Sequence, residues 1–200
     1  MTPVAYGYVT SITYMGASWS HDPVTVYITL QKGVDPSYRA EVLKALTDWS
    51  DALKSASGNS GAFDFNVLDT PQSKKTPADI TITLKKNTGA VLGSAQLSPS
   101  GETIVSAKIV LATQNSMGLP LGKEDFRNIL RHELGHALGL GHANDNGIGA
   151  KDLMYPYYDF ITVGYDVYPS NFDLNALIKL YGNDGFGGAY NLHPIPPSYP

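Results

Sequence analysis

The sequence from residue 132 to residue 142 reads His132-Glu133-Leu134-Gly135-His136-Ala137-Leu138-Gly139-Leu140-Gly141-His142, and it fits the pattern HExxHxxGxxH in full. On a helix, residues four apart project from one face, so His132 and His136 can hold one metal ion while Glu133 stays beside it. Two histidines at this spacing could also be polar surface or satisfied core residues. The glycine and the third histidine at fixed offsets favour a zinc site over that ordinary amphipathic helix.

The third histidine requires a turn in the chain. A straight helix would carry His142 roughly 9 Å past His136 along its axis, by the rise per residue. We expect Gly139 to supply the turn, because glycine takes φ > 0 without a Cβ penalty and commonly ends helices in that conformation. Three neutral imidazoles would leave the fourth tetrahedral position of zinc open, which is typical of a catalytic zinc.

The composition indicates one ordinary folded domain. The chain has 200 residues and 42% hydrophobic content, which is enough to bury a core. Its 14 basic and 18 acidic residues give a net charge of -4, and no basic cluster indicates nucleic acid or an anionic membrane as a partner. The absence of cysteine excludes disulfides and thiolate metal ligands. No run of about 18 apolar residues is present and the first residues lack a secretion signal, so we expect no membrane segment and a mature form or an excised domain.

The chain divides into three regions. Residues 1–22 contain no Lys or Arg and alternate tyrosine and β-branched residues from Tyr6 to Tyr14, which predicts an N-terminal arm that packs as a strand. This arm could instead lie over a groove. Residues 23–183 carry the remaining strand and helix patterns and form the main domain. Residues 184–200 are rich in proline and glycine and are typical of a C-terminal tail.

The main domain combines strand and helix patterns. Strands are predicted over residues 24–30, 63–68, 78–84, 89–99 and 103–112. Helices are predicted after an N-cap at Asp35, from about Lys123, and up to Gly182 after a capping box formed by Ser170 and Asp173. This order implies a mixed, twisted sheet, and the glycines and prolines of residues 89–99 favour an exposed edge strand.

Together these residues resemble the metzincin metallopeptidases, and among them the matrixins most closely. The zinc motif is complete, Met154 lies in a Leu-Met-Tyr-Pro sequence similar to the matrixin Met-turn, and residues 179–182 resemble the end of the family's last helix. The resemblance implies an α+β single domain over residues 23–183, the metallopeptidase catalytic domain. Its twisted, mostly parallel mixed sheet would have an antiparallel edge strand and two long helices packed on it, followed by a C-terminal subdomain with a Met-turn and a final helix.

The resemblance also implies roles for single residues. One catalytic zinc would be bound by His132, His136 and His142, with Glu133 as general acid and base. Met154 would form a structural base beneath the metal. Two groups of residues would bind the substrate. Gly93, Ser94 and Ala95 would belong to an edge strand that pairs with an extended peptide. Pro156 and Tyr158 would line the wall of the pocket just past the scissile bond.

The sequence also departs from the matrixin pattern. The connection from His142 to Met154 is longer than usual. Ser94 stands near the place of a histidine, which argues against the family's second, structural zinc. Acidic residues are sparse in that region, which argues against the usual calcium sites and leaves calcium binding open.

The predicted function is that of a zinc-dependent endopeptidase acting on protein or peptide substrates. We expect a monomer, and resemblance alone suggests a secreted or extracellular protein. One alternative is a narrow-scope peptidase that processes itself or one substrate, with the arm restricting access; a gain of activity on removing residues 1–22 would favour it. Another is a catalytically silent binding module, although such a scaffold has no need of Glu133.

Overall fold

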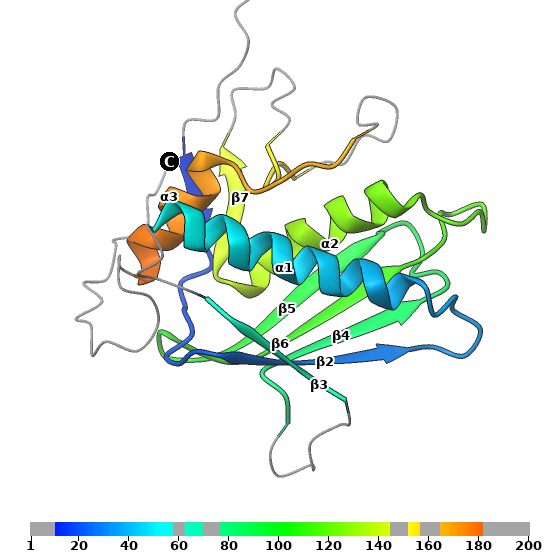
Figure 1. The fold of residues 1–200 in the computed structure, drawn as a ribbon, viewed down its shortest axis with the longest axis horizontal. Coiled ribbons are helices and arrows are strands. Elements are labelled where there is room, and N and C mark those ends of the chain that lie inside the picture. The colour runs from blue at the N-terminus through cyan, green and yellow to red at the C-terminus, as the bar shows by residue number, and fades with distance from the viewer. Residues whose placement is uncertain (1–10, 58–62, 70–76, 145–151, 157–164, 182–200) are drawn as a thin grey trace, which may run out of the picture.

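The computed structural model describes residues 11–57, 63–69, 77–144, 152–156 and 165–181. The elements in chain order, labelled in Figure 1, are β1 (Ser11–Tyr14), β2 (Val24–Leu30), α1 (Tyr38–Ala56), β3 (Phe65–Leu68), β4 (Ile80–Lys85), β5 (Gly93–Ser100), β6 (Thr103–Ala112), α2 (Lys123–Ala137), β7 (Leu140–Asn144) and α3 (Asn171–Tyr181). Residues 1–10 of the predicted arm and the predicted tail at 184–200 lie outside the described residues. Within the described ranges, we find no helix whose length and apolar character would allow it to cross a membrane.

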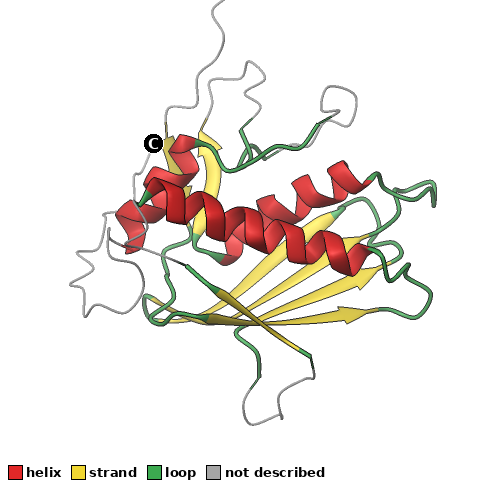
Figure 2. Cartoon of the chain, in the orientation of Figure 1, coloured by secondary structure: helices red, strands yellow, loops and turns green. Residues whose placement is uncertain are grey.

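Five strands form the main sheet in the order β3-β2-β4-β6-β5. The first four are parallel, and β5 pairs with β6 in the antiparallel direction at the edge. Alternate residues of β4 are buried, as expected when helices cover one face of a sheet. Figure 2 shows α1 and α2 together on that face. The predicted fold, a mixed and mostly parallel sheet with an antiparallel edge strand and two long helices, is confirmed.

Helix α1 supports the helix that carries the zinc motif. Trp49, predicted to be a core residue, is fully buried, and its indole N–H donates to the backbone oxygen of Arg131 in α2 at 3.0 Å. The start of α1 differs from the prediction. The Asp35 carboxylate accepts the N–H of Ser37 two residues on, at 2.8 Å, which is the bond that an N-cap makes, but the regular helix begins only at Tyr38 and not at Pro36. A tight turn therefore precedes the helix, because the first backbone bonds join residues three apart, such as the N–H of Tyr38 to the oxygen of Asp35.

A second, two-stranded sheet joins the N-terminal segment to the end of the zinc motif. Strand β1 pairs with β7 in the antiparallel direction, with Ile12 opposite Ala143 and Tyr14 opposite Leu140. The predicted strand character of the arm is thus confirmed for residues 11–14. Strand β7 was not predicted, because His142 and its neighbours carry no strand pattern of their own and are ordered by a partner far away in sequence.

Helix α3 begins with the predicted capping box. The N–H of Ser170 donates to the Asp173 carboxylate at 2.8 Å, and the N–H of Asp173 donates to the Ser170 hydroxyl at 3.2 Å. Burial is the main reason that the pKa of Asp173 is raised, to about 8, and the neighbouring Asp152 raises it further. This cap fixes the last helix where it packs against α1 and the second sheet.

Buried ion pairs attach the segment before α3 to helix α2. The carboxylate of Asp166 accepts two hydrogen bonds from Arg127, at 2.8 and 2.7 Å, and one from Arg131 at 2.9 Å. Arg131 is fully buried and also donates to Asp48 of α1 at 2.9 Å. The guanidinium groups hold the pKa of Asp166 down to about 2. Through Arg127 and Arg131 the network therefore joins α1, α2 and the segment before α3.

Replacing Asp166 with asparagine should lower the free energy of unfolding of the metal-free protein by about 2 kcal/mol at neutral pH. A depressed carboxyl pKa gives stability that is present above the ordinary value of 3.8 and is lost as the pH falls through about 2. The parent should therefore lose this difference between about pH 4 and pH 2, whereas the variant should not. Urea unfolding at a series of pH values measures both.

The matched control for this prediction is Asp64→Asn. Asp64 also forms an ion pair, with Lys54 at 2.9 Å, but both side chains are substantially exposed. Loss of such a surface pair should change the free energy of unfolding by less than about 1 kcal/mol. Equal losses in the two variants would contradict the role given to the buried network.

Candidate metal centre

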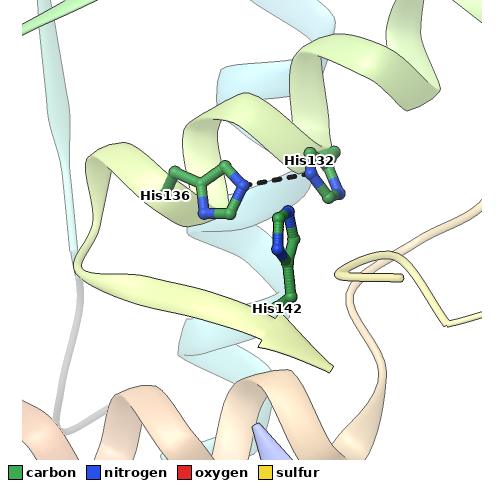
Figure 3. A group of neighbouring side chains, drawn as sticks. All are labelled: His132, His136 and His142. Atoms are coloured by element: carbon green, nitrogen blue, oxygen red, sulfur yellow. Dashed lines mark hydrogen bonds between the residues drawn. The ribbon is translucent and has the colours of Figure 1, made fainter. Parts of the chain in front are cut away.

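Three imidazoles converge at the carboxyl end of α2. His132 and His136 project from the helix, His142 projects from β7, and the three rings point toward one another in Figure 3. Their candidate ligand atoms all lie within 4.8 Å of one another. The Nε2 atoms of His132 and His136 are 3.1 Å apart, close to the separation of about 3.3 Å that two nitrogens have on one tetrahedral zinc. Elsewhere in the described ranges, no other group of three or more His, Cys, Asp or Glu side chains could hold a metal ion.

Backbone carbonyls set the orientation of two of these rings. The Nδ1–H of His132 donates to the oxygen of Leu153 at 2.7 Å, and the Nδ1–H of His136 donates to the oxygen of Leu140 at 2.8 Å. Since a carbonyl can only accept, each ring turns the lone pair of Nε2 toward the shared centre. Burial lowers the pKa of His132 to about 4 and also lowers the pKa of His136 and His142. Three neutral nitrogen donors facing one point fit zinc.

The turn that brings His142 back to the helix lies at Gly139. Its φ of 99° is in the left-handed region that glycine adopts without strain. The backbone also leaves no room for a side chain, because a Cβ at this position would lie 2.6 Å from the oxygen of Ala17. Both the conformation and the close contact therefore require glycine, and the turn lies where the sequence predicts it.

Glu133 lies between the histidines and the edge strand. Its carboxylate accepts a hydrogen bond from the backbone N–H of Ala95, which lowers its pKa, but burial has the larger effect and raises the pKa to about 7. Gly93, the first residue of β5, lies so close that a Cβ there would be 2.7 Å from the Glu133 carboxylate. The predicted substrate strand and the predicted base are therefore in direct contact.

Met154 packs against α2 at Gly135, the residue before His136. It is fully buried, and a Cβ on Gly135 would collide with its sulfur. Its backbone oxygen accepts the N–H of Ala143 in β7 at 2.8 Å. Met154 thus contacts both the helix and the strand that carry the histidines. Pro156 is exposed after it, and Tyr158 lies outside the described residues.

Three further residues, which the sequence did not single out, hold the carboxyl end of α2 and the turn. The indole N–H of Trp19 donates to the oxygen of Ala137 at 2.9 Å, and the hydroxyl of Tyr181 donates to the oxygen of Leu138 at 2.7 Å. Thr13 donates its hydroxyl to the oxygen of His142 at 2.9 Å. The sequence signals were that Trp19 lies in a segment without Lys or Arg and that Tyr181 lies on the apolar face of the last predicted helix, and neither signal predicts these partners.

Comparison with known proteins gives a family for this arrangement. The family model described as matrixin matches residues 18–182. Two curated relatives are similar over short stretches: stromelysin-2 of Rattus norvegicus is 41% identical over 54 residues, which are 27% of this chain and 10% of that protein. Interstitial collagenase of Oryctolagus cuniculus is 44% identical over 64 residues, 30% of this chain and 12% of that protein. The chain thus matches only about a tenth of the length of these relatives.

Solved structures with a similar chain include archaemetzincin from Methanopyrus kandleri, with a TM-score of 0.48, 14% identity, and coverage of 78% of this chain and 93% of that one. High choriolytic enzyme 1, a hatching enzyme zinc-protease from Oryzias latipes, has a TM-score of 0.42 and 12% identity, and the match covers 82% of this chain and 92% of that one. The family match includes every element from β2 to α3 together with the three histidines. The chain therefore belongs to the matrixin family of metzincin zinc metalloproteases.

Proposed function

We propose that this chain is a zinc-dependent endopeptidase that hydrolyses peptide bonds in extended substrates, with zinc bound by His132, His136 and His142. The observation that carries the proposal is the convergence of three neutral imidazoles beside a buried carboxylate that touches an edge strand. A scaffold that only held a metal would not need that carboxylate. Membership of the matrixin family supports the same conclusion.

Zinc at this centre would supply Lewis-acid chemistry, polarising the scissile carbonyl and making water acidic enough to ionise near neutral pH. The chain's own part of the reaction belongs to Glu133. Its carboxylate accepts the proton of the attacking water and then delivers it to the leaving amine. Burial raises the pKa of Glu133 to about 7 in the metal-free chain, and the positive charge of a zinc ion bound beside it would favour the ionised carboxylate that accepts a proton. The N–H of Ala95 fixes the direction of the carboxylate.

The substrate would bind along β5, whose second edge has no strand partner among the described residues. An extended peptide added to this edge would form main-chain hydrogen bonds and direct alternate side chains into pockets. Gly93, Ser94 and Ala95 would pair with the peptide, which places the bond to be cut next to Glu133. Pro156 and Tyr158 would line the pocket after the cut, and we expect that pocket to prefer an apolar residue.

The alternative of a narrow-scope peptidase assumes that the N-terminal arm restricts access of substrates to the site. Removing residues 1–22 is not a suitable test of this alternative. Trp19 is only 3% exposed and is bonded to α2, so that deletion would damage the fold as well as any barrier. Deletion of residues 1–10 alone keeps every described contact. A gain of activity in that shorter deletion would favour a narrow-scope peptidase.

The proposed function is tested by measuring zinc content by mass spectrometry together with cleavage of a quenched-peptide library. We expect one zinc per chain, loss of cleavage after treatment with a chelator, and recovery when zinc is added back. Product masses should show internal cuts. Cleavage that survives complete removal of metal would contradict the proposal, and cuts confined to the ends of the peptides would contradict an endopeptidase.

A further inference from the structure

The segment that carries His142 is held mainly by residues from the start of the chain. The N–H of Met15 donates to the oxygen of Gly139 at 2.8 Å, and the Thr13 hydroxyl donates to the oxygen of His142 at 2.9 Å. Between these two bonds, β1 pairs with β7. Every residue from the turn to the third histidine is therefore next to the N-terminal segment.

Two glycines allow this approach. A Cβ on Gly141 would collide with the Thr13 hydroxyl and would lie 3.1 Å from the backbone carbon of Thr13. A Cβ on Gly139 would lie 2.6 Å from the oxygen of Ala17. The N-terminal segment thus contacts the chain closely both before and after Leu140, the first residue of β7. This close fit indicates a built interface rather than a loose covering.

The strand β7 has few other supports. Its only strand partner in the described part of the chain is β1, and its backbone is also bonded through the N–H of Ala143 to Met154 and through the oxygen of Leu140 to His136. A two-stranded sheet is marginally stable alone, so β7 and β1 depend on the packing and the ligands that fix them. Ile12 is buried, and Tyr14 donates its hydroxyl to the oxygen of Ala176 in α3 at 3.4 Å, which attaches β1 to the last helix.

We propose that Ser11–Trp19, here called the N-terminal clamp, is a positioning element of the metal centre that holds His142 in place for zinc. The proposal rests on the proposed role of His142 as a zinc ligand. It has a reciprocal consequence: if the clamp strengthens zinc binding, zinc must strengthen the clamp by the same factor. The clamp therefore determines zinc affinity without contributing a ligand, and zinc orders a segment that begins more than one hundred residues before the motif.

The first test uses Thr13→Val and Thr13→Ser in the full chain. Valine keeps the shape of the side chain but removes the hydrogen bond to His142, whereas serine keeps the bond. Zinc affinity, measured by competition with a chromophoric chelator, should fall about fivefold in Thr13→Val and change less than about twofold in Thr13→Ser. A larger loss is expected in Gly141→Ala, because the new methyl group separates β1 from β7.

Circular dichroism in chelator separates this effect from unfolding. The clamp is supported if Thr13→Val unfolds at the parent's temperature without metal and still binds zinc more weakly. It is overturned if Thr13→Val and Gly141→Ala both bind zinc as the parent does. Failure of the parent itself to bind zinc would overturn the proposed function instead, so the two failures are distinguishable.

Hydrogen exchange tests the reciprocal effect without any substitution. Adding zinc to the parent should slow exchange of the Met15 amide, which is bonded to Gly139, and of the amides in β1. Amides in β2, within the main sheet, serve as the internal reference. Equal protection of residues 11–15 with zinc and with chelator would overturn the proposal, even if every variant happened to fold poorly.

Discussion

Replacing Glu133 with glutamine should leave one zinc per chain and reduce peptide cleavage by about 10² to 10⁴-fold or more. Glutamine matches the shape of glutamate and can keep the hydrogen bond from Ala95, so the contact with β5 survives. It cannot accept and return a proton. Because the imidazoles are oriented by Leu153 and Leu140 and not by Glu133, the metal donors should stay in place. The loss should therefore appear in kcat, with little change in zinc content.

The matched control is Glu124→Gln, the same substitution in the first turn of the same helix. The Glu124 side chain is 54% exposed and contacts Arg127 at 3.4 Å, far from the histidine cluster in sequence. We expect wild-type cleavage in this variant. If Glu133→Gln retained the parent's turnover, Glu133 would not be the general base. If the same variant lost its zinc, the loss of cleavage could not be assigned to proton transfer.

The parts of the fold that were predicted well are those governed by local pattern. Strand β6 was predicted at residues 103–112 and α2 from Lys123, and both have these bounds, because apolar periodicity and first-turn acids act within a few residues. The start of α1 was predicted only approximately, since Asp35 accepts the N–H of Ser37 as a cap would, but a tight turn separates it from the helix, which begins at Tyr38. Choices of this kind depend on one or two hydrogen bonds, which sequence patterns do not resolve.

The candidate site shows a similar division. The spacing of the motif predicted three histidines and a glycine turn, because helix geometry fixes which side chains share a face. The residues that hold the centre together were not predicted. Trp19, Thr13 and Tyr181 are bonded to the end of α2, to β7 and to the turn between them, respectively, and these bonds span sequence separations of 118, 129 and 43 residues. Only the tertiary fold brings these groups together, so no local pattern could reveal them.

Replacing Gly139 with valine should weaken zinc binding by about 100-fold, the upper range for changes just outside a ligand shell. A β-branched residue at a φ of 99° is strained, and its Cβ would also lie 2.6 Å from the oxygen of Ala17 and 3.0 Å from Leu180. Both effects move the turn and with it His142, while His132 and His136 remain on the helix. Competition with a chelator gives the affinity, and mass spectrometry gives the zinc content.

Gly118→Val separates the two causes of that loss. Gly118 has a similar φ of 79°, but a Cβ there would meet nothing within 4 Å. This control carries the backbone strain, about 1–2 kcal/mol, without the collision and away from the metal centre. It should lower the free energy of unfolding slightly and leave zinc affinity unchanged. If Gly139→Val bound zinc as tightly as the parent, the turn would not determine the position of His142; if Gly118→Val lost zinc as well, the loss would reflect general destabilisation and not the geometry of the third ligand.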